Sequence, residues 1–159
     1  MNKKAFTMIE LVFVIVILGI LAGVALPKLT VSRDDATMAK MRADVASIRS
    51  GIALQKSKYM MEGNISGWRD NIEGLVKDNF SGVIQGGIKL NNNPEKMMNG
   101  WAIIKKEEDG KNYYKACIAK KCARFKFTIT DKDNAKIGEF ECTTIVIEGK
   151  KVNNCNLFE

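Results

Sequence analysis

Residues 6–27 read FTMIELVFVIVILGILAGVALP, an apolar run that carries a single acid, Glu10, near its start. Sixteen consecutive uncharged residues follow the acid, from Leu11 to Leu26. A helix of about 20 apolar residues crosses the roughly 30 Å of hydrocarbon in a bilayer. A carboxylate inside such a helix costs on the order of 2.5–3.5 kcal/mol, so an acid retained there usually has a charged partner. The length predicts a membrane-spanning segment, and Glu10 indicates a role beyond anchoring.

Three interpretations of this segment are open on the residues alone. A secretory signal peptide also has a basic leader, and residues 22–25 (AGVA) offer a small-residue cleavage site, but its apolar region is normally about 7–15 residues long. A plain membrane anchor explains the length and leaves Glu10 without a role. The third interpretation is processing between Ala5 and Phe6, which creates a new amino terminus four residues before Glu10. We favour this one, because the new terminus could neutralise Glu10 of a neighbouring subunit inside an apolar assembly.

Residues 3–12, KKAFTMIELV, resemble the prepilin cleavage and methylation motif of type IV pilins and type II secretion pseudopilins. The resemblance implies that a prepilin peptidase cuts between Ala5 and Phe6 and that the new amino group of Phe6 is methylated. Phe6 and Glu10 match the family's most characteristic positions, and Pro27 matches its proline after the apolar segment; assembly roles for Glu10 and Pro27 are implied. The family usually has glycine before the cut. Alanine is the next smallest side chain, so we expect cleavage to occur. The resemblance covers about the first thirty residues.

The resemblance also implies an organisation and a location. Residues 1–5 would be a cleaved leader, residues 6–30 a transmembrane and filament-core helix segment, and residues 31–159 a periplasmic globular head. The implied partners are other pilins in a homo- or hetero-oligomeric helical filament, the prepilin peptidase, an inner-membrane assembly platform and the lipid bilayer. The expected location is the bacterial inner membrane, followed by a periplasmic pseudopilus or a cell-surface pilus. Lys3 and Lys4 fit a cytoplasmic leader under the positive-inside rule.

The function expected from the sequence is a structural subunit of a type IV pilus-like filament, either a pilin or a secretion pseudopilin, and not an enzyme. Histidine is absent, which removes the commonest general base and the imidazole metal ligand and excludes Ser-His and Cys-His catalysis. A secreted enzyme behind an ordinary signal peptide is a competing class of protein. It predicts a mature amino terminus near Leu26, whereas the filament subunit begins at Phe6.

The residues after the apolar run predict an α+β, pilin-like fold. Apolar residues recur at helical spacing from about Ser32 to Met60, which indicates an amphipathic helix that continues past Pro27. These residues are Met38, Met41, Val45, Ile48, Ile52 and Tyr59. Residues 63–67 are expected to break the helix, and residues 68–80 predict a short helix or an irregular connector.

From Val83 onward the pattern changes to strands. Phe125, Phe127 and Ile129 alternate with polar residues, which indicates a half-buried strand. Further candidate strands are residues 102–104, 113–116 and 144–147, and turn signals lie at residues 91–94, 109–110, 131–134 and 149–150. We therefore predict one long N-terminal helix, half apolar and half amphipathic, packed on a four- or five-stranded antiparallel sheet.

Four cysteines lie in the last third of the chain: Cys117, Cys122, Cys142 and Cys155. An even number in an exported protein indicates two disulfides, for which the sequence allows three connectivities. We favour Cys117–Cys122 and Cys142–Cys155, since each closes a short loop. A four-cysteine zinc site is the alternative, although the spacing lacks a Cys-x-x-Cys pair.

A basic cluster surrounds the first cysteine pair: Lys115, Lys120, Lys121, Arg124 and Lys126. The formal net charge is +7, and such cations could contact phosphates. The runner-up function is therefore a minor pilin whose basic head binds DNA during uptake or adheres to a surface. A solvated strand face is the simpler interpretation of the same residues.

A second cluster carries oxygen ligands, at Asp131, Asp133 and Glu139. These side chains could hold calcium, but the glycine and the distal glutamate of the EF-hand pattern are absent and Lys132 weakens the negative field. A solvated hairpin turn explains the cluster more simply, so we expect no cofactor.

Overall fold

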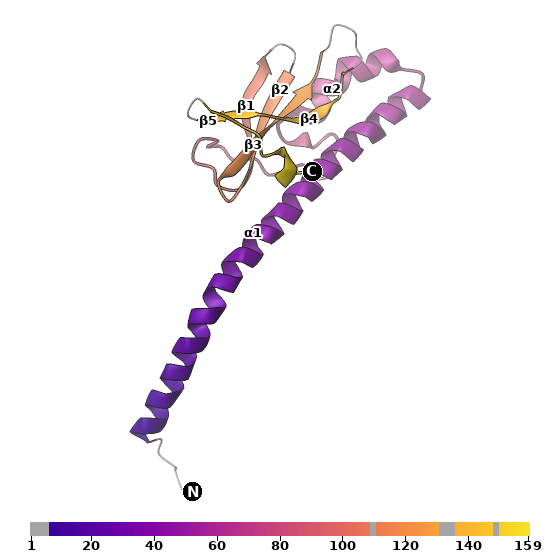
Figure 1. Cartoon of the computed structure of the whole chain (residues 1–159). Coiled ribbons are helices and arrows are strands. Elements are labelled where there is room, and N and C mark those ends of the chain that lie inside the picture. The colour runs from indigo at the N-terminus through magenta and orange to yellow at the C-terminus, as the bar shows by residue number, and fades with distance from the viewer. Residues whose placement is uncertain (1–6, 109–110, 131–135, 148–149) are drawn as a thin grey trace, which may run out of the picture. The chain divides into compact units, whose positions relative to one another are not determined.

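The structure is a computed structural model that describes residues 7–108, 111–130, 136–147 and 150–159. Its elements are α1 (Met8–Met61), α2 (Ile65–Phe80), β1 (Gly100–Glu108), β2 (Lys111–Ile118), β3 (Lys121–Thr128), β4 (Phe140–Thr143), β5 (Ile145–Ile147), β6 (Lys150–Val152) and the 3-10 helix η1 (Cys155–Leu157) (Figure 1). An N-terminal helix followed by an antiparallel sheet is the predicted α+β order. The chain divides into two compact units, residues 1–36 and 37–159.

The first unit contains the apolar part of α1. The large hydrophobic side chains described there are exposed in the single chain, from 40% at Ile17 to 84% at Met8. Pro27 lies within the 54 residues of α1, which confirms that the helix continues past the proline. The structure describes no side chain from 25 to 32, and none of the helices in its described residues is long and apolar enough to cross a membrane.

In the second unit, α1 buries the stripe that the sequence predicted. Met41, Val45 and Ile48 are exposed by 2% or less, and Ile52 by 5%. Met38 and Tyr59, at the two ends of the stripe, are partly buried against the same core. Side chains at these spacings share one helix face. Burying that face gives this part of α1 most of its stability, since helical propensity alone contributes little.

Four strands form one antiparallel sheet in the order β1-β2-β3-β4, and β5 and β6 form a separate two-stranded sheet. Tyr114 on β2 lies opposite Ile103 on β1 and opposite Phe125 on β3. The sequence predicted a strand at residues 144–147, and β5 lies there, but β5 pairs with β6 instead of joining the larger sheet. The fourth strand of that sheet is β4, which was not predicted: its alternation is only four residues long, too short to signal a strand.

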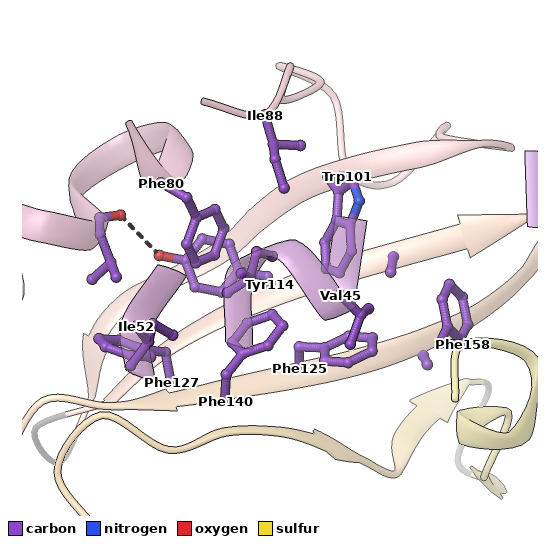
Figure 2. Packing of buried hydrophobic residues seen from close by; sticks show 14 of the residues in the cluster. Val45, Ile52, Phe80, Ile88, Trp101, Tyr114, Phe125, Phe127, Phe140 and Phe158 are labelled. Atoms are coloured by element: carbon purple, nitrogen blue, oxygen red, sulfur yellow. Dashed lines mark hydrogen bonds between the residues drawn. The ribbon is translucent and has the colours of Figure 1, made fainter. Parts of the chain in front are cut away.

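Aromatic rings fill the space between α1, α2 and the inner face of the sheet (Figure 2). Phe125 stacks on Phe140 with ring centroids 5.0 Å apart, and Phe80 lies 4.5 Å from Tyr114. The Tyr114 hydroxyl donates a hydrogen bond to the Val76 carbonyl at 3.4 Å, so the polar end of this buried ring is satisfied. These contacts join α2 to the sheet.

The C-terminal residues close one end of this core. The Phe158 ring is 1% exposed and meets Phe125 edge-on, with centroids 5.6 Å apart. From α1, Arg42 donates hydrogen bonds to the carbonyls of Leu157 and Asn156 at 3.1 and 3.2 Å. These bonds satisfy carbonyls in the last residues of the chain and hold the tail against α1.

Candidate functional site

The first turn of α1 presents Glu10 in a capped and otherwise apolar setting. The Thr7 hydroxyl accepts a hydrogen bond from the Glu10 amide at 3.3 Å, and the Thr7 carbonyl accepts from the amides of Glu10 and Leu11. Thr7-x-x-Glu10 is the spacing of a capping box, in which a hydroxyl residue starts the helix and a Glu or Gln follows three positions later. Thr7 was not among the residues predicted from the sequence, although its capping-box spacing to Glu10 is a signal that identifies it.

The Glu10 carboxylate has no hydrogen bond or ion pair among the residues that the structure describes. Its surroundings are apolar, because the neighbouring side chains on the same helix, Ile9, Val12, Phe13 and Val16, are all exposed. A negative charge in the first turn is favoured by the helix dipole, which contributes about 0.3–1 kcal/mol. The structure thus places this acid on an apolar helix surface without a partner among the described residues.

The structure does not describe the side chains of three predicted N-terminal residues. Ala5 and Phe6 lie outside the described residues. Pro27 is described only as part of the α1 backbone. Cleavage before Phe6, methylation of its amino group and the assembly role of Pro27 therefore stay predictions.

Both disulfides in the structure are the pairs that the sequence analysis favoured. Cys117 and Cys122 lie directly opposite each other on β2 and β3, with Cα atoms 4.1 Å apart. Cys142 on β4 is bonded to Cys155 on η1, with Cα atoms 5.7 Å apart. All four cysteines lie in the described part of the chain and none is free, so no thiolate is left for the zinc alternative.

The basic cluster does not form one free cationic surface. Lys115 donates a hydrogen bond to the Pro94 carbonyl at 2.7 Å, and Lys126 forms an ion pair with Glu141 at 2.8 Å. Arg124 lies over the Tyr113 ring, 5.2 Å from its centroid, and donates a hydrogen bond to the Thr143 hydroxyl. The remaining two, Lys120 and Lys121, are exposed at the turn between β2 and β3.

The predicted oxygen cluster falls mostly outside the described residues, because Asp131 and Asp133 are not described. Glu139 is described, and its Oε2 is buried without a hydrogen-bond partner. Within the described ranges, no three acidic, cysteine or histidine side chains are placed to hold a metal ion. The expectation that this loop holds no cofactor therefore stays a prediction.

Comparison with known proteins identifies the N-terminal segment. The prokaryotic N-terminal methylation motif matches residues 1–26. The type IV narrow pilus major component PilA5 of Thermus thermophilus is 44% identical over 54 residues, which are 34% of this chain and 47% of that protein. Type II secretion system core protein G of Klebsiella michiganensis is 34% identical over 55 residues, 35% of this chain and 39% of that protein.

The matched region therefore spans less than half the length of these two relatives. No solved structure matches the chain significantly. The motif match covers the segment that contains Glu10. This chain thus carries the prepilin-type N-terminal methylation segment that is found in type IV pilins and in type II secretion pseudopilins.

Proposed function

We propose that this protein is a structural subunit of a type IV pilus-like filament, either a pilin or a type II secretion pseudopilin. The observation that carries the proposal is the methylation motif at residues 1–26, which overlaps the start of α1 (Met8–Met61), together with the antiparallel sheet that comes after this helix in the chain. One relative is by name a major pilus component and the other a core protein of a secretion system. A structural role in either kind of filament is consistent with both names.

Processing would begin at the leader. The prepilin peptidase would remove residues 1–5 and methylate the amino group of Phe6, while the subunit is stored in the inner membrane with its head in the periplasm. The assembly platform would then move the apolar helix from lipid into a bundle of like helices. The exposed apolar side chains of residues 8–24 support this step, because they need a covering of lipid or protein. Head-to-tail packing of identical subunits generates an open helical filament.

In this filament, Glu10 sets the register between neighbouring subunits. Its carboxylate would pair with the amino group of Phe6 in the next copy, and the pair would be neutral within the apolar bundle. A buried ion pair of this kind contributes little net stability, but breaking it by removing one partner costs about 3–5 kcal/mol. The pairing therefore selects one axial offset between helices and penalises the others.

The variant Glu10→Gln tests whether Glu10 acts through its charge or through its place in the helix cap. Glutamine is also accepted at the third position of a capping box, so this variant keeps the cap and loses the charge. We expect normal cleavage and no filaments, measured by mass spectrometry and by electron microscopy of sheared fractions. The matched control is Thr7→Ala, which keeps the charge, loses a cap worth about 1 kcal/mol and should still assemble. Normal filament yield from Glu10→Gln would refute the pairing.

The mature amino terminus tests the proposal as a whole. Mass spectrometry of the processed chain should find N-methylated Phe6 as the first residue. A terminus near Leu26 would instead identify an ordinary signal peptide and remove the filament proposal. The DNA-binding alternative draws no specific support from the head, because Lys115, Arg124 and Lys126 are already held by contacts within the chain.

A further inference from the structure

A groove of about 470 Å³ lies on the second unit, at the edge of the sheet formed by β1. Its lining comes from α1, from the segment before β1 and from the start of β1: Lys40, Lys89, Leu90, Asn91, Asn92, Asn99, Gly100 and Trp101. Small-molecule sites commonly have volumes of about 300–1,000 Å³. The groove is therefore large enough for a ligand of one or two sugar rings.

The floor of the groove is fixed by contacts inside the fold. The Asn91 amide donates a hydrogen bond to the Trp101 carbonyl at 2.7 Å, and Leu90 forms a parallel bridge with Trp101. The Trp101 indole donates to the Asp44 carboxylate at 3.0 Å, and its side chain is only 2% exposed. These contacts tie the segment before β1 to β1, and β1 to α1. The polar side chains of the groove therefore extend from a backbone that is already fixed before a ligand binds.

The charge of the lining has one sign. Lys40 and Lys89 are the only ionisable residues among the eight that line the groove, and both are exposed. No hydrogen bond or ion pair is described for either ammonium group within the described residues. The nearest acid along α1 is Asp44, one turn from Lys40, and its carboxylate already accepts the Trp101 indole. Two cations without a described partner therefore face the groove.

The asparagines add neutral donors to these cations. The Asn99 side-chain oxygen accepts a hydrogen bond from the Ala119 amide at 2.8 Å, and the Asn91 side-chain oxygen accepts from the Asn93 amide at 2.9 Å. With these oxygens in use, each side chain offers its NH₂ group as a donor. Asn92 adds a third amide to the lining. The groove therefore presents mainly hydrogen-bond donors, which match a ligand rich in acceptor oxygens.

We propose that this groove binds an acidic sugar, such as a uronate unit of a polysaccharide. The carboxylate would pair with Lys40 and Lys89, and the asparagine amides would donate to hydroxyl and ring oxygens. A nucleic acid fits less well, because single strands are held by exposed aromatic faces along a row of cations, and the Trp101 ring is buried. The proposal does not depend on filament assembly, since every residue involved lies in the second unit.

The test is a calorimetric titration of the full-length chain, in micelles of a nonionic detergent, with tri-galacturonate. We expect saturable binding that weakens as salt is raised, because it includes ion pairs. The double variant Lys40→Gln/Lys89→Gln should lose at least tenfold in affinity. The matched control is Lys58→Gln, an exposed lysine in the last turn of α1, which should bind as the wild type does.

Four results would overturn the proposal. They are no saturable binding at millimolar tri-galacturonate, a change of less than twofold in the double variant, equal binding of the neutral trisaccharide maltotriose, and tighter binding of oligo(dT) or of inorganic phosphate than of the uronate, which would assign the groove to phosphate. Filament yield of the double variant should equal that of the wild type, and its loss would identify a subunit contact. Absence of wild-type filaments would refute the proposed function and leave the titration unaffected.

Discussion

At the scale of single residues, the approach of α1 to the backbone of Val83 depends on a glycine. A Cβ atom at Gly51 would overlap the Val83 carbonyl, whereas one at Gly74 in α2 would meet nothing within 4 Å. We therefore expect Gly51→Ala to lower the free energy of unfolding by about 1–3 kcal/mol through overpacking. Gly74→Ala should raise it by about 0.5–1 kcal/mol, because alanine favours the helix and restricts the unfolded chain.

Urea denaturation followed by circular dichroism measures both glycine variants. The comparison is matched, since the two substitutions add the same methyl group to a helix and change the unfolded chain alike. Destabilisation of equal size at Gly51 and Gly74 would contradict the close approach of α1 to Val83.

Glu141 makes a small part of the stability depend on pH. The hydrogen bond and the charge of Lys126, with Nζ 2.8 Å from Glu141 Oε2, hold the pKa of this carboxyl below its ordinary value. A carboxyl with a lowered folded-state pKa adds stability above its unfolded pKa and loses it as the pH falls through the folded pKa. Because the Glu141 side chain is 46% exposed, we expect only about 0.2–1 kcal/mol.

The corresponding variant is Glu141→Gln. The difference in unfolding free energy between wild type and Glu141→Gln should be constant from pH 7 to about pH 5.5 and should shrink below the ordinary carboxyl pKa near 4.5. Urea denaturation at each pH measures it. A difference that grows on acidification would show that Lys126 does not stabilise the charged form.

At the scale of elements, the two disulfides should contribute unequally. Cys142–Cys155 has a sequence separation of 13 and ties the C-terminal tail to β4, whereas Cys117–Cys122 has a separation of 5 and joins two strands that already pair. Loop-closure entropy gives about 3 kcal/mol for the longer loop and about 2 kcal/mol for the shorter. We expect Cys142→Ser/Cys155→Ser to destabilise more than Cys117→Ser/Cys122→Ser, as measured by chemical denaturation. The opposite order would show that the tail is held without its disulfide.

Elements with long periodic patterns were predictable, and those fixed by a partner were not. The stripe from Met41 to Ile52 repeats at helical spacing over several turns, so α1 could be predicted from sequence. The strand β4 offers only Phe140 and Cys142 as an alternating pair, and it exists because β3 provides a ladder for it. For the same reason, nothing in the sequence indicated that Arg42 holds the C-terminal tail.

At the scale of the whole molecule, stability should reside in the second unit. Every buried hydrophobic residue described lies at Met41 or beyond. A chain without residues 1–32 should remain soluble without detergent and unfold cooperatively, with a free energy within about 1 kcal/mol of the full chain. A chain without residues 1–46 also loses Met41 and Val45, each worth about 1.5–3 kcal/mol, and should be clearly less stable. Equal stability of the two truncated chains would contradict this assignment of the core.

The sequence by itself determined the processing motif, the apolar helix with Glu10 and the amphipathic stripe, and it favoured one of the three possible cysteine pairings. These features depend on residues that are close in the chain or on a period that repeats along one helix, so local pattern is enough to define them. Only the tertiary structure decided which cations are occupied within the fold and which face a groove. Lys40 and Lys89 are distant in sequence and line one groove because Trp101 of β1 bonds Asp44 of α1. Lys126 is paired because β4 places Glu141 opposite it. Such encounters depend on long-range strand register and helix packing, which no short stretch of sequence encodes.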